Sequence, residues 1–78
     1  MNQFKVTLQL ENEILDFSFN QIYTAAGEKF FITVNKDGSD FVFDIQKDGY
    51  GRWKIGEPAP KWVRAIEREL IEAINPNN

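Results

Sequence analysis

The fold of this chain is decided by residues 30–45, FFITVNKDGSDFVFDI, in which two runs of alternating side chains flank an Asp37-Gly38 turn. Large apolar residues recur at every second position on both sides of the turn, at Phe30, Ile32, Val34, Phe41, Phe43 and Ile45. A period of two places such residues on one face of a β-strand. Asp-Gly between two runs of this kind is a strong hairpin signal. The segment therefore predicts an antiparallel β-hairpin.

The same alternation extends along the chain on both sides of this hairpin. Apolar and polar residues alternate over residues 4–10 and 15–19, and Trp53 and Ile55 follow another turn at residues 47–49. Short connections favour antiparallel pairing, because a parallel crossover needs a dozen or more residues. Residues 20–29 are less regular, and the sequence leaves open whether they extend the second strand or form a loop.

The pattern changes after the prolines at positions 58 and 60. Proline cannot donate to a sheet but is tolerated in the first turn of a helix. From Ala59 to Ile74 seven apolar residues recur with a period of 3.6 and fall within about a third of the circumference, and Ile71 lies at its border. Asn75-Pro76 ends the helix, because a residue that precedes proline is disfavoured in the α conformation.

These elements predict an α+β fold, a four- to five-stranded antiparallel β-meander with one C-terminal amphipathic helix packed across one sheet face. We expect residues 1–75 to form a single α+β domain, since 78 residues are too few for a second core. Residues 76–78 are expected to form a frayed C-terminal tail.

The chain contains no histidine and no cysteine. These residues most often supply a general base, a nucleophilic thiolate or a transition-metal ligand. The sequence therefore favours a non-enzymatic protein with no catalytic residue, no cofactor and no metal site. An enzyme that relies on carboxylates such as Asp16 and Asp44, on the polar faces of two different strands, is the remaining catalytic alternative.

The composition also bears on location and partners. A net charge of −3 argues against a nucleic-acid partner or an anionic membrane surface. The first six residues alternate without the apolar segment of a signal peptide, and no apolar run approaches the roughly 18 residues of a membrane span. Since there is no cysteine for disulfides, we expect a cytoplasmic protein with no membrane partner.

The most suggestive feature is a set of apolar residues where polar ones are expected. Phe31 and Val42 interrupt the polar face of the third and fourth strands, and Tyr23 is expected to join them. One helix covers one face of a sheet, so these three residues should lie on the uncovered face. Apolar patches with polar rims often mark interfaces. The leading hypothesis is a non-catalytic protein-binding or adaptor module, whose partner is an unknown protein or a second copy in a homodimer.

The alternative hypothesis is a small-molecule binding domain. Its pocket would lie between sheet and helix and be lined by Phe17, Phe43, Trp53 and Trp62. The two tryptophans are expected to meet over residues 58–60 and to hold the helix on the sheet.

A third hypothesis is single-stranded nucleic-acid binding. Tyr50, Arg52 and Lys54 alternate in the last strand and would share one face. An aromatic ring beside two cations resembles a minimal platform on which bases stack. The acidic net charge disfavours this hypothesis.

Overall fold

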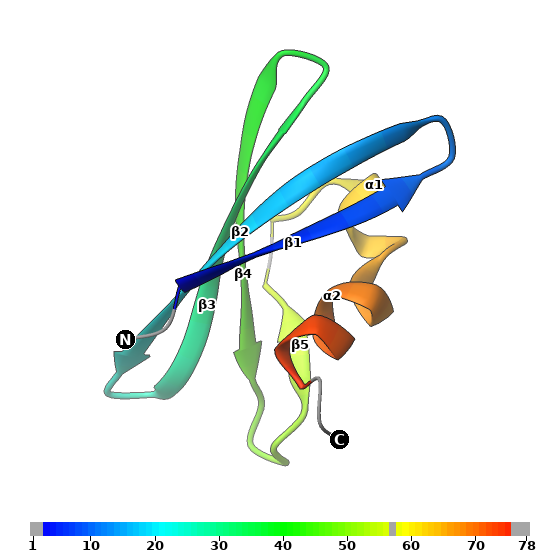
Figure 1. Cartoon of the computed structure of the whole chain (residues 1–78). Coiled ribbons are helices and arrows are strands. Elements are labelled where there is room, and N and C mark those ends of the chain that lie inside the picture. Colours follow the sequence, from blue (N-terminus) through cyan, green and yellow to red (C-terminus); the bar gives the residue numbers. More distant parts are fainter. Residues whose placement is uncertain (1–2, 57, 76–78) are drawn as a thin grey trace.

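The computed structural model describes residues 3–56 and 58–75, and the expected frayed tail at residues 76–78 lies outside the described residues. Five strands are followed by two short helices, which confirms the predicted α+β class (Figure 1). The elements are β1 (Gln3–Leu10), β2 (Glu13–Thr24), β3 (Gly27–Lys36), β4 (Ser39–Lys47), β5 (Trp53–Ile55), α1 (Lys61–Arg64) and α2 (Glu67–Ile74).

The strands form one antiparallel meander in the order β1-β2-β3-β4-β5. The sheet curls into a half-barrel, and the helices lie on its concave side (Figure 1). The hairpin predicted from residues 30–45 is confirmed, with Ile32 opposite Phe43 and Val34 opposite Phe41. Asp37 and Gly38 have φ values of 55° and 81°. Positive φ at both central residues is what a two-residue hairpin turn of this hand requires.

Residues 20–29 extend the second strand and begin the third. β2 continues to Thr24, a turn occupies Ala25 and Ala26, and β3 begins at Gly27. The alternation of apolar and polar residues is interrupted here because the polar Gln21 occupies a core-facing position, where it is only 6% exposed. Its side-chain amide donates to the carboxylate of Glu28 on the neighbouring strand at 2.6 Å. This bond offsets the desolvation of a polar group within an apolar row.

The core is a single apolar cluster between the concave face of the sheet and the helices. β2, β3 and β4 supply most of it, and each helix adds one fully buried residue, Val63 from α1 and Leu70 from α2. The buried members are Leu15, Phe17, Phe19, Phe30, Ile32, Val34, Phe43, Ile45, Ile55, Val63 and Leu70.

The predicted single helix is divided in two. Ala65 and Ile66 separate α1 from α2, and Ile66 has φ −113° and ψ 20°, outside the α region. The Ile66 amide donates to the Val63 carbonyl, three residues back, so the backbone is tighter here than in an α-helix. The apolar period could not reveal this break, because both halves present the same side to the core.

The two tryptophans do not pack against each other, so that expectation is wrong. The Trp53 ring lies 5.5 Å from Phe30, whereas the Trp62 ring lies 5.5 Å from Phe41 and 6.2 Å from Phe17. Phe30 and Phe41 lie towards opposite ends of the β3–β4 hairpin. The tryptophans therefore seal the core at two separate places instead of forming one corner.

Replacing Leu70 by alanine should cost about 2–5 kcal/mol of unfolding free energy, because it leaves a cavity where α2 enters the core. Leu70 is 0% exposed. Glu72→Ala on the exposed side of the same helix is the matched control and should change stability by less than about 0.5 kcal/mol. Urea denaturation of both variants measures the difference, and equal midpoints would mean that α2 is not docked.

Candidate functional site: the outer sheet face

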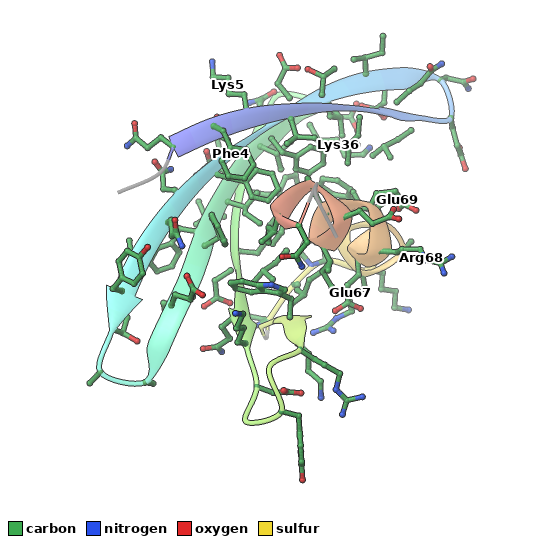
Figure 2. The ribbon with its side chains drawn as sticks, turned by 60° about the horizontal axis from the view of Figure 1, so that its bottom comes forward. Phe4, Lys5, Lys36, Glu67, Arg68 and Glu69 are labelled. Atoms are coloured by element: carbon green, nitrogen blue, oxygen red, sulfur yellow. The ribbon has the colours of Figure 1, made fainter. Side chains whose placement is uncertain are left out.

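Alternation gives the sheet a concave face, towards the helices, and an outer face on the opposite side. Figure 2 shows the division at β1, where Phe4 points towards the helices and Lys5 points away from them. Phe31 and Val42 lie on the outer face, where they are 39% and 63% exposed. Val42 pairs with Thr33, two residues from Phe31, so the two apolar residues are diagonal neighbours on adjacent strands.

Tyr23 does not share the outer face with them. It pairs with Glu28, in the same alternating row as Gln21, and so belongs to the concave face beyond the end of the core. There its side chain is 70% exposed. Ile22, which pairs with Lys29, takes the outer-face position instead. Sequence reasoning missed Ile22 because the face of each residue in this stretch depends on β2 continuing without interruption to Thr24.

Ile22, Phe31 and Val42 thus form a line across three neighbouring strands, which we call the outer diagonal. Each is a diagonal neighbour of the next, on β2, β3 and β4. The Lys29 ammonium lies 4.8 Å from the centre of the Phe31 ring and 3.5 Å from the Asp44 carboxylate. Lys29 is thus held between the Phe31 ring and the Asp44 carboxylate. This ion pair gives the outer diagonal a charged border.

The residues expected to line a pocket are distributed differently. Phe17 and Phe43 are 0% and 4% exposed and belong to the packed core. Trp62 lines one surface groove and Trp53 lines another. Neither groove includes Phe17 or Phe43, so the structure does not bring the four residues together around either groove.

The groove beside Trp62, here the Trp62 groove, has a volume of about 720 Å³. It lies between the tip of the β1–β2 hairpin and the break between the helices. Its apolar part comes from Leu8, Leu10, Trp62, Ala65 and Ile66, and its polar part from Gln9, Glu11, Asn12, Glu13, Lys36 and Glu69.

Lys36 is the central cation of the Trp62 groove. Its ammonium lies 3.0 Å from Asp37, 3.1 Å from Glu13 and 5.6 Å from the centre of the Trp62 ring. The bonds to Asp37 and then to Glu13 raise the pKa of this ammonium above its ordinary value. Lys36 and Glu69, both labelled in Figure 2, line the groove from the sheet and from α2.

Tyr50, Arg52 and Lys54, the residues expected to form a nucleic-acid platform, do not share the face of one strand. β5 begins at Trp53, so Tyr50 and Arg52 lie in the turn before it. Tyr50 is 86% exposed, with the Arg52 guanidinium 5.6 Å from its ring. Arg52 and Lys54 both lie near the Asp48 carboxylate, at 3.8 and 3.9 Å. That carboxylate offsets part of their charge.

The two carboxylates considered for catalysis are not neighbours. Asp16 is on β2 and accepts from the Thr7 hydroxyl at 2.7 Å, whereas Asp44 is on β4 and pairs with Lys29. β3 lies between their strands. Within residues 3–56 and 58–75, no group of three or more acidic side chains is arranged to hold a metal ion.

Comparison with known proteins found no matching family model, no matching curated protein and no matching solved structure. None of the helices in the described part of the chain is long and apolar enough to cross a membrane. Function must therefore be inferred from this chain's own surfaces.

The turn before β5 should depend on pH through Asp48. Its carboxylate accepts from the amides of Arg52 and Tyr50, at 3.0 and 2.8 Å, and these bonds hold its pKa below the ordinary value. A lowered pKa in the folded state gives stability above the ordinary pKa that is lost as the pH falls through the lowered one.

Asp48→Asn keeps an acceptor oxygen but removes the charge. The difference in unfolding free energy between the parent and this variant should therefore be largest near neutral pH and shrink in acid. Urea denaturation across the acidic range measures it. A difference that stays constant or grows in acid would show that the Asp48 charge does not stabilise this turn.

Proposed function

We propose that this chain is a non-catalytic protein-binding or adaptor module that recognises a partner protein through the outer diagonal. The observation that carries the proposal is a line formed by the exposed Phe31 and Val42 and the half-buried Ile22, on a face that no helix covers within the described residues. The proposal includes a cytoplasmic location, with which a cysteine-free sequence is compatible.

The outer diagonal has the physical features of a recognition surface. Its three side chains stand on the central strands of a sheet, so little backbone freedom is lost when a partner covers them. Burial of their apolar area contributes about 25 cal/mol for each Å² removed from water. Lys29 and Asp44 beside Phe31 supply the polar rim that orients a partner.

A second candidate function is small-molecule binding in the Trp62 groove. Its volume of about 720 Å³ lies within the range of ordinary ligand sites. An apolar wall that contains Trp62, faced by Lys36, Glu13 and Glu69, offers a flat ring for stacking and charged groups for orientation. This site differs from the sequence-based pocket in every residue except Trp62.

Phe31→Asp should weaken partner binding at least about tenfold, since truncation of an interface anchor costs more than about 1.4 kcal/mol. The probe is a set of peptides selected from a random displayed library against the immobilised chain. Binding is then measured by fluorescence anisotropy, and each peptide's footprint by shifts of the backbone amide signals. Thermal unfolding checks that the variant remains folded.

Ile14→Asp is the matched control. Ile14 is also apolar and 66% exposed, and it lies on the same face towards the β1–β2 turn, away from the outer diagonal. Peptides should bind this variant as they bind the parent. Equal affinity for the parent and Phe31→Asp would refute the proposal, and shifts at Leu8 and Trp62 would favour the groove instead.

A further inference from the structure

The two edge strands of the sheet, β1 and β5, differ in whether another element covers their outer side. β5 is three residues long, and the outward amide of Ile55 donates to the Glu67 carboxylate on α2 at 3.1 Å. Figure 2 labels Glu67 on the helix that closes this edge. β1 has eight residues, and no strand within the described residues pairs with its outer side.

β1 has one feature that keeps exposed edges apart, the charged Lys5, and lacks the others. Natural edge strands are often very short, or they carry charged residues such as lysine, a proline or a bulge. β1 contains no proline, its pairing with β2 runs without a bulge from Gln3 to Leu10, and Lys5 is its single charged residue. Such an edge can accept another strand.

The apolar side of β1 is incomplete within one chain. Phe4 and Val6 are only partly buried, whereas their partners on β2, Phe19 and Phe17, are 1% and 0% exposed. Leu8 is likewise partly buried and opens onto the Trp62 groove. A strand added at this edge would cover all three residues.

The outward hydrogen-bonding groups of β1 follow from its register. A two-residue hairpin closes on a hydrogen-bonded pair, here Leu10 and Glu13, so the even-numbered residues of β1 bond to β2. The odd-numbered residues, among them Lys5 and Thr7, direct their backbone amides and carbonyls to the free edge.

The strand is complementary to itself in antiparallel pairing. With the twofold axis at Val6, Phe4 lies opposite the partner's Leu8, and Lys5 lies opposite the partner's Thr7. Moving the axis to Thr7 also matches apolar with apolar and polar with polar residues. An axis at Lys5 would set two ammonium groups opposite each other, which is unfavourable.

We propose that two copies of this chain form a symmetric dimer by antiparallel pairing of their β1 edges, with the twofold axis at Val6 or Thr7. Lys5 and Thr7 then exchange backbone hydrogen bonds with the partner's odd-numbered residues, and the partner's Phe4 extends the apolar wall of the Trp62 groove. The dimer uses an edge and leaves both copies of the outer diagonal exposed, so it is independent of the proposed function.

Sedimentation velocity over a range of concentrations tests the dimer. The parent should convert from monomer to dimer, and Thr7→Lys should raise the dissociation constant at least about tenfold. The new ammonium would face the partner's Lys5 or its own copy, according to the axis. Thr33→Lys makes the same exposed substitution on β3, away from the edge, and should dimerise like the parent.

Disulfide cross-linking tests the register of the β1 pairing. The chain has no cysteine of its own, so an introduced cysteine can form a disulfide only with its copy in the partner. Val6→Cys or Thr7→Cys should form a covalent dimer at least about tenfold faster than Gln9→Cys, since a disulfide needs Cα atoms about 4.4–6.8 Å apart. Val42→Cys on the outer diagonal is the control and should remain slow.

Three results would overturn the proposed dimer. The first is a strict monomer at the highest concentration that stays in solution, and the second is a dimer that Thr7→Lys leaves unchanged. The third is a dimer that Phe31→Asp abolishes and Val42→Cys cross-links fastest, which would place self-association on the outer face. Because the peptide assay reads a different surface, either proposal can fail while the other stands.

Discussion

The architecture depends on the packing of one short helical segment against the concave side of a curled five-stranded sheet. Val63 and Leu70, both 0% exposed, insert from the two helices among side chains of the strands. A domain of this size has little apolar surface to bury. The packing of the helices therefore determines which face of the sheet is buried from water. The opposite face and the far edge lie beyond the reach of the helices.

The same contact explains why the surface is uneven. α2 closes the β5 edge through Glu67 and leaves the β1 edge open. On the outer face the cations are largely tied to neighbouring carboxylates, as Lys29 is to Asp44. On the concave side beyond the core, Lys47 pairs with Glu28 in the same way. Exposed ion pairs add little stability, but they weaken long-range attraction for charged partners. Under both proposals recognition would depend on uncharged contacts, on apolar side chains at the outer diagonal and on backbone pairing at β1.

Much of this fold could be predicted from the sequence, because strand alternation and Asp-Gly turns are local signals. The hairpin of residues 30–45, the meander and the amphipathic C-terminal segment follow from them. The faces of residues 20–29 could not be predicted, since Gln21 is polar and becomes compatible with the core only through its bond to Glu28. With Gln21 in the core row, the alternation continues through Ile22 and Tyr23, and Tyr23 lies on the face opposite to the expected one. The separate packing of the tryptophans likewise depends on tertiary contacts, with Phe30 for Trp53 and with Phe17 and Phe41 for Trp62.

The most direct test of this account is the assignment of faces in solution by nuclear Overhauser contacts. The account predicts contacts from the Phe31 ring to the methyl groups of Ile22 and Val42, and none from these residues to the methyl groups of Val63 or Leu70. Contacts from Tyr23 to Phe31, or from either helix to Val42, would contradict the register and the uncovered outer face together.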